Sequence, residues 1–301
     1  MGKNLFLESE FAQRPREEAL FHVIPVPFEK SVSYGSGTAD GPAAILAASD
    51  QLEVFDGFSS PAEEGIHTAQ PIDCSGTTGQ VFDRIAEATA RASLEGPPSG
   101  GIPVVLGGEH AITAPAVRGI LRARELSAKN LGIVQFDAHA DLREAYEDNP
   151  NSHASVARRL HQDIGTPLVQ IGVRAISPEE VLYRATASAS KTLWFQDASQ
   201  IVPAGTTEIS LPSEFPREVY ITIDVDGLDP SVILATGTPV PGGIPWYQFL
   251  ALVESVVRQR RVVGFDVVEL APIAGQHAWD YGAAEIVYRT MGLVTRAAAA
   301  G

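Results

Sequence analysis

Short apolar segments typical of buried strands alternate with helical patterns along nearly the whole chain, and this alternation is what most limits the fold. The predicted strands are residues 20–27, 102–106, 131–136, 167–174, 191–195, 218–226 and 262–269. Helical spacing or a helix start follows at residues 41–54, 79–94, 113, 152–162, 177, 245–258 and 281–298. Such alternation is typical of a parallel sheet with helices on both faces. Because no repeat or linker divides the chain, we expect one α/β domain over residues 1–301.

Four of the predicted strands end in acidic or histidine residues. In a parallel sheet, ligands bind outside the carboxyl ends of the strands, so these side chains should gather on one rim. The residues concerned are His110, Asp137, His139, Asp141, Asp224, Asp226 and Glu269.

The run from Asp137 to Asp141 is the most informative of these strand ends. Alternation along an extended chain points Asp137, His139 and Asp141 to one side, and the two intervening alanines to the other. Taken alone, the motif also fits a polar strand end in solvent, and Asp224–Pro230 also fits a turn. The two Asp-rich ends together with His110 favour a binding site over these alternatives.

Carboxylates crowded on one rim repel each other unless cations compensate their charge. Two divalent ions bridged by carboxylates would do so, and would activate water for hydrolysis. Imidazole and carboxylate ligands without a thiolate suit Mn²⁺, although Zn²⁺, Fe²⁺, Co²⁺ and Ni²⁺ also bind such ligands. The rim therefore predicts metal-assisted hydrolysis.

The charge and cysteine content of the chain limit the kinds of partner and metal site that we expect. The net charge is −15, from 22 basic and 37 acidic residues, and no basic stripe suggests nucleic acid binding. The acidic balance is compatible with a cationic substrate. The single cysteine, Cys74, cannot form an intrachain disulfide or a thiolate zinc site. Because the chain shows no signal-peptide core and no membrane-length apolar run, we expect a cytoplasmic protein without a membrane partner.

Four motifs stand in the order and spacing found in the ureohydrolases, and the chain resembles agmatinases more closely than arginase. They are Gly-Gly-Glu-His at 107–110, Asp-Ala-His-Ala-Asp at 137–141, Asp-Val-Asp-Gly-Leu-Asp-Pro at 224–230, and Phe-Asp-Val-Val-Glu-Leu-Ala-Pro at 265–272. The resemblance implies a three-layer α/β/α fold of the arginase/deacetylase type with a mostly parallel, eight-stranded sheet. It also implies two Mn²⁺ ions per subunit, hydrolysis of a guanidino group to urea and an amine, and a homo-oligomer, trimeric or hexameric.

The same resemblance implies roles for individual residues. One ion would take His110, Asp137, Asp141 and Asp224, and the other His139, Asp137, Asp224 and Asp226. Glu269 would pair with the guanidinium, His153 would pass a proton to the leaving amine, and Asp141 would act beside them. Thr238 would line the substrate site. The family often has Asp where this chain has Glu109, which puts the outer-shell hydrogen bonds of His110 in question.

The loop at residues 142–151 should influence substrate choice. Its acidic members Glu144, Glu147 and Asp148 favour a distal ammonium, whereas Arg143, if turned inward, favours a distal carboxylate; we expect Arg143 to face solvent. We therefore predict a small cationic guanidino substrate, agmatine, cleaved to putrescine and urea. The alternatives are 4-guanidinobutanoate, guanidinopropanoate, guanidine and arginine.

Two other classes of function are open. A catalytically silent assembly or regulatory subunit is disfavoured by the complete set of six ligands. A two-metal phosphoesterase would need cationic groups near the rim, and apart from Arg143 and Arg174 few stand near the motifs. Of the other histidines, we expect His22 to be structural, His67 to lie in a surface loop and His161 on a helix surface. His277 has no ligand motif and could at most touch the site mouth.

Overall fold

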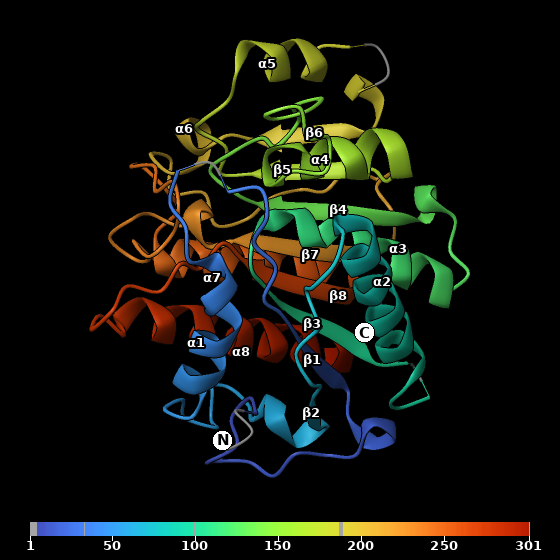
Figure 1. Cartoon of the computed structure of the whole chain (residues 1–301), viewed down its shortest axis with the longest axis vertical. Helices are drawn as coiled ribbons and strands as arrows, with labels where there is room; N and C mark the ends of the chain where they lie inside the picture. The colour runs from blue at the N-terminus through green and yellow to red at the C-terminus, as the bar shows by residue number, and fades with distance from the viewer. Residues whose placement is uncertain (1–4, 33, 99, 187–188, 301) are drawn as a thin grey trace.

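The computed structural model describes residues 5–32, 34–98, 100–186 and 189–300 (Figure 1). Eight strands form one sheet in the order β2-β1-β3-β8-β7-β4-β5-β6, and every pairing between neighbouring strands is parallel. The strands are β1 Phe21–Val26, β2 Ile66–Thr68, β3 Ile102–Gly107, β4 Leu131–Phe136, β5 Leu168–Ile171, β6 Leu193–Gln196, β7 Glu218–Asp224 and β8 Arg261–Val268. The predicted parallel sheet is confirmed.

Helices cover both faces of this sheet, which gives the three layers implied by the resemblance (Figure 1). Helices α1, α7 and α8 pack on one face, and α2, α3 and α4 with the π-helical turn that continues it pack on the other. The α-helices are α1 Gly41–Ser49, α2 Thr78–Leu94, α3 Thr113–Ala123, α4 Val156–Arg158, α5 Pro178–Arg184, α6 Ala198–Ile201, α7 Trp246–Gln259 and α8 Ala278–Ala300; the π-helix spans Arg159–Ile164.

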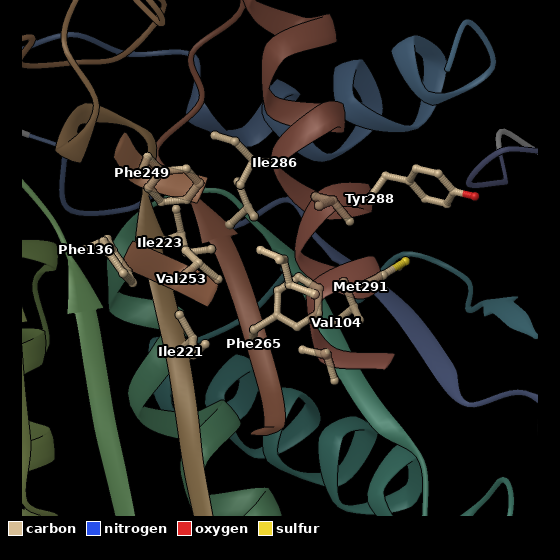
Figure 2. Packing of buried hydrophobic residues seen from close by; sticks show 14 of the residues in the cluster. Val104, Phe136, Ile221, Ile223, Phe249, Val253, Phe265, Ile286, Tyr288 and Met291 are labelled. Carbon is tan, nitrogen blue, oxygen red and sulfur yellow. The ribbon is translucent and has the colours of Figure 1, made fainter. Parts of the chain in front are cut away.

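The larger core lies between the sheet and helices α7 and α8 (Figure 2). Helix α7 presents Phe249, Val253 and Val256 to the sheet, a spacing of four and three residues that keeps one helical face apolar. The ring of Phe249 meets Phe136 of β4 edge-on, with 5.3 Å between centroids. Each such fully buried side chain contributes about 1.5–3 kcal/mol through removal of apolar area from water.

The order of the strands places the polar strand ends together. The four central strands, β3, β8, β7 and β4, are the ones predicted to end in functional residues. Because all four run in the same direction, His110, Glu269, Asp224 and Asp137 emerge at the same edge of the sheet. The flanking strands widen the sheet and bury its centre.

Two histidines are placed differently from the sequence-based expectation. His67 belongs to β2, a three-residue edge strand too short to show periodicity, and not to a loop. His161 is buried rather than on a helix surface. Both of its ring nitrogens have polar partners, the Tyr183 hydroxyl at 2.6 Å and Thr192 Oγ1 at 2.9 Å. His22 is buried in β1, as expected. Among the described residues, no helix combines the length and apolar character needed to cross a bilayer.

Candidate metal centre and active site

The imidazole of His110 faces three carboxylates. Its Nδ1 atom lies 3.2 Å from Asp137 Oδ2, 3.2 Å from Asp141 Oδ2 and 3.4 Å from Asp224 Oδ2. This buried nitrogen has no hydrogen-bond partner among the described residues, whereas Nε2 lies 2.8 Å from Thr222 Oγ1. One nitrogen and three oxygens converging from the ends of three strands, β3, β4 and β7, form the kind of donor set that holds a divalent ion.

A second cluster adjoins the first through Asp137. His139 Nδ1 lies 3.0 Å from Asp226 Oδ2 and 3.7 Å from Asp137 Oδ1. The groups His110–Asp137–Asp141 and Asp137–His139–Asp226 each bring ligand atoms within 4.8 Å of one another. The six residues expected to bind metal are therefore brought together, and Asp137 belongs to both groups.

Backbone hydrogen bonds orient the ligand carboxylates. Asp224 accepts the N–H of Asp226 through Oδ1 and turns Oδ2 toward His110. Asp226 accepts the N–H of Ala138 through Oδ1 and turns Oδ2 toward His139. Gly227 allows this approach, because a Cβ there would lie 2.8 Å from the backbone nitrogen of Asp137. The ends of β4 and β7 thereby come close enough to share one site.

Burial and the crowded carboxylates shape the pKa values in this cluster. Burial would lower the pKa of His110, but the neighbouring carboxylates of Asp137, Asp141 and Asp224 together raise it well above 6.5. Burial likewise opposes protonation of His139, and Asp226 raises the pKa of His139 to about 10. Burial and the charge of Asp137 raise the pKa of Asp141 to about 7. Carboxylates that favour the charged form of two imidazoles in this way also favour the binding of a cation.

Polar residues in the strand interiors support the ligands from behind, and sequence reasoning missed them. Thr222 in β7 contacts His110, and Gln135 in β4 donates to Asp137 Oδ2 at 2.7 Å. Gln170 in β5 donates to Gln135 in turn. Thr222 and Gln135 each stand two residues before a ligand in an otherwise apolar strand, so strand alternation puts them on the ligand side. A polar residue two positions before a ligand in an apolar strand was therefore the sequence signal that could have identified them.

Glu269 lies beside the cluster in a strained backbone conformation. Its φ angle is 65°, in the left-handed region, and Asp141 has a φ of 52°. Non-glycine residues in this region cost roughly 1–3 kcal/mol and are often found at functional sites. Glu269 Oε1 accepts the backbone N–H of His110 at 2.6 Å. Burial raises the pKa of Glu269 to about 8.

A cavity of about 540 Å³ opens above these residues. Its lining includes His139, Asp141, Asp224, Asp226 and Glu269, together with four more residues singled out from the sequence: His153, Thr238, Arg143 and Arg174. Burial and the neighbouring charge of His110 lower the pKa of His153 to about 4, so its imidazole is neutral at pH 7. His277 has an 85% exposed side chain beside Asp280 and is not among the lining residues of the cavity.

The loop at 142–151 contributes different residues from those expected. Arg143, predicted to face solvent, lines the cavity with Tyr146, and its guanidinium lies 5.3 Å from the Tyr146 ring centroid. Glu144 instead forms ion pairs with Arg158 at 2.6 Å and Arg159 at 3.5 Å. Glu147 and Asp148 are exposed and are not lining residues. The acidic residues of the loop therefore do not supply the site for a distal ammonium.

The other guanidinium in the wall is already engaged. Arg174 donates to the carbonyl oxygen of Asp226 at 2.6 Å and to that of Val240 at 2.7 Å. It also donates to the carbonyls of Gly172, Gly227 and Leu228. Arg174 therefore links the segments that carry these carbonyls. Few of its N–H groups remain to bind a substrate. Tyr34, 88% exposed, adds an aromatic side chain to the same wall.

Comparison with known proteins extends over nearly the whole chain. A family model described as the arginase family matches residues 19–292. An N(1)-aminopropylagmatine ureohydrolase of Synechocystis sp. is 34% identical over 304 residues, covering 97% of this chain and 94% of that protein. An agmatinase of Pyrococcus horikoshii is 30% identical over 282 residues, covering 93% and 94%. Among solved structures, the agmatine ureohydrolase of Thermoplasma volcanium superposes with a TM-score of 0.82 at 26% identity, covering 98% and 96%.

Proposed function

Because the chain belongs to the arginase family and is a metal-dependent ureohydrolase of the agmatinase type, we propose that it cleaves agmatine and N(1)-aminopropylagmatine, the second in preference. The observation that carries this proposal is that four of the six ligand residues line one open cavity together with Glu269, while His110 and Asp137 are buried in contact with them. Loss of urea would leave putrescine from agmatine and spermidine from the aminopropyl derivative.

The reaction joins a water oxygen to the guanidinium carbon and breaks the bond from that carbon to the chain nitrogen. Both protons of the water pass to this nitrogen, so the products are neutral urea and an ammonium, and the positive charge of the guanidinium ends on the amine. Glu269 has one carboxylate oxygen on the His110 N–H and the other available to accept guanidinium N–H groups. Neutral His153 can accept a proton and deliver it to the leaving nitrogen. Asp141, in the cavity lining, can accept a hydrogen bond from the attacking water.

We propose that two Mn²⁺ ions occupy the centre, one on His110, Asp137, Asp141 and Asp224 and the other on His139, Asp137, Asp224 and Asp226. The donor set fits them, since it contains only imidazole and carboxylate atoms and includes the unpartnered Nδ1 of His110. When bound, such ions lower the pKa of water and stabilise negative charge at the reacting carbon's oxygen.

Support for a substrate without a carboxylate comes from the relatives and from the cavity wall. The two sequence relatives above are named for agmatine or its aminopropyl derivative. Arg174 is engaged by backbone carbonyls, which leaves it poorly placed to bind a distal acid. Tyr34 and Tyr146 offer aromatic faces near the mouth, and such faces attract ammonium groups by about 0.5–1 kcal/mol at exposed sites. A second amine on a longer substrate chain is the kind of group that these rings would attract.

Arg143 supports a second candidate substrate. Its guanidinium lines the cavity, and a cation there suits the carboxylate of 4-guanidinobutanoate. The Arg143 guanidinium also contacts the Tyr146 ring, and it remains part of the cavity lining.

The deciding experiment is a substrate panel on manganese-loaded protein. Urea release would be compared for agmatine, N(1)-aminopropylagmatine, 4-guanidinobutanoate, guanidinopropanoate, arginine and guanidine at matched concentrations. We expect the highest kcat/KM for N(1)-aminopropylagmatine, with agmatine next. A preference for an acid-tailed compound would replace this proposal with the second candidate. A fully loaded protein inert toward all six would point to a silent subunit.

A further inference from the structure

The buried carboxylate of Glu109, outside the proposed metal site, accepts hydrogen bonds from the segment that precedes the cavity-lining residue Val32. Glu109 is 0% exposed and directly precedes His110. Its Oε2 accepts the backbone N–H groups of Lys30 at 2.8 Å and Ser31 at 2.7 Å. Its Oε1 accepts the hydroxyl of Ser31 at 2.8 Å. Three donors from one loop are therefore satisfied by a single side chain.

Ser31, which Glu109 holds in place, also contacts His153. Its Oγ accepts the backbone N–H of His153 at 3.1 Å and lies 3.4 Å from His153 Nδ1. The single hydroxyl proton of Ser31 is directed at Glu109, so Oγ can meet Nδ1 only as an acceptor. The network thus places the proton of neutral His153 on Nδ1. Nε2 is then the ring nitrogen that can accept a proton.

The length of the Glu109 side chain matters because its backbone is fixed. Gly108 donates to Val26 and Glu109 donates to Phe28, which ties the end of β3 to the segment after β1. An Asp at this position would be one methylene shorter on the same backbone. It would not reach all three donors without movement of the loop.

We propose that Glu109 and Ser31 are positioning residues that fix the tautomer and the orientation of His153. The inference rests on the proposed function, in which His153 delivers a proton to the leaving amine. The same contacts fix the backbone at Lys30 and Ser31, next to Val32, which lines the cavity. The Glu109 carboxylate thereby positions both His153 and the neighbouring segment of the cavity lining.

A double-mutant cycle between Ser31→Ala and His153→Ala tests this coupling. We expect Ser31→Ala to lower kcat about tenfold, a part of the roughly 100-fold or more that general acid–base catalysis supplies, with KM nearly unchanged. In the His153→Ala background the same change should have almost no effect on kcat. Equal losses in both backgrounds would overturn the proposal.

Ser36→Ala is the matched control. Ser36 lies in the same loop, is exposed, and is not a lining residue of the cavity. We expect wild-type kcat for this variant. Glu109→Asp should reproduce the loss seen in Ser31→Ala while keeping its charge, and wild-type kcat in Glu109→Asp would contradict the argument from side-chain length. Thermal unfolding and metal content of each variant separate these effects from misfolding.

A readout independent of catalysis is the tautomer itself. Nitrogen chemical shifts of the histidines in the metal-free protein, assigned by comparison with His153→Ala, report which ring nitrogen carries the proton. We expect His153 protonated on Nδ1, and a shift toward Nε2 protonation in Ser31→Ala. Protonation on Nε2 in the wild type would refute the inference even if the enzyme is active. Absence of urea release with the Nδ1 tautomer present would instead count against the proposed function.

Discussion

The Nε2 atom of His110 lies 2.8 Å from Thr222 Oγ1, which turns the opposite nitrogen, Nδ1, toward the three carboxylates. The hydroxyl of Thr222 can accept an N–H from Nε2, and this leaves Nδ1 without a proton when a cation binds. The Thr222 side chain thus orients His110 in the proposed metal site, where the sequence had left the outer-shell hydrogen bonds of His110 in question. Glu109 is directed elsewhere, to Lys30 and Ser31.

Replacing Thr222 by Val should weaken metal binding. The change keeps the shape of the side chain but removes the acceptor for His110 Nε2, and loss of such outer-shell partners costs about 10–100-fold in metal affinity. Titration of metal-free protein with Mn²⁺ measures the effect, and excess Mn²⁺ should restore most activity. Thr290→Val is the control, because the buried Thr290 hydroxyl has no partner among the described residues. Equal affinities for the two variants would contradict this role.

Metal affinity should rise with pH between about 6 and 9. The pKa of His139 is raised to about 10 and that of His110 lies well above 6.5, so both rings carry protons that a metal must displace. Lower pH strengthens that competition, and binding at neutral pH should release protons to the buffer. Calorimetry in buffers of different ionisation enthalpy counts them. Affinity that is independent of pH, with no proton release, would show that these pKa values do not govern the site.

Glu269→Gln should reduce kcat/KM while leaving the metal content unchanged. Gln retains an acceptor for the His110 N–H but cannot ionise, whereas a bound guanidinium would lower the raised pKa of Glu269 and pair with the carboxylate. Removing one partner from a buried ion pair costs about 3 kcal/mol, or roughly 100-fold. The measurement is urea release at saturating Mn²⁺, with Glu147→Gln in the exposed loop as control. A loss below threefold would place the guanidinium elsewhere.

Arg143→Ala should separate the two candidate substrates. Under the proposed function, removing a cation from the wall relieves repulsion, so activity toward N(1)-aminopropylagmatine should be unchanged or rise by up to about threefold, in the range of exposed charge interactions. Activity toward 4-guanidinobutanoate should fall if Arg143 binds its carboxylate. The ratio of the two kcat/KM values is the readout, because a general loss of stability affects both substrates alike. A larger loss for the cationic substrate would contradict the proposed wall.

The fold and the gathering of the proposed metal ligands could be predicted because each depends on local pattern and one general rule. Alternation predicted that Asp137, His139 and Asp141 face one side, and the common direction of parallel strands predicted that they meet Asp224 and His110. That residues 1–301 form a single domain, that the protein forms trimers or hexamers, and that it is cytoplasmic stay predictions.

The parts that sequence reasoning missed depend on contacts between distant segments. Glu144 is held away from the cavity by Arg158 and Arg159, and Glu109 meets a loop 78 residues away. No periodicity reports such pairs, because loop conformations are set by tertiary contacts. β2 was missed because three residues cannot show a period, and His161 because its partners Tyr183 and Thr192 come from later elements.

The central claim, a ureohydrolase with a two-metal centre, is tested most directly by titrating metal-free protein with Mn²⁺ while urea release from N(1)-aminopropylagmatine and agmatine is followed. Activity should increase until two ions are bound per chain and then remain constant, and Asp137→Ala should abolish both the second equivalent and the activity. Full loading without urea from either substrate, or maximal activity with a single bound ion, would contradict the account.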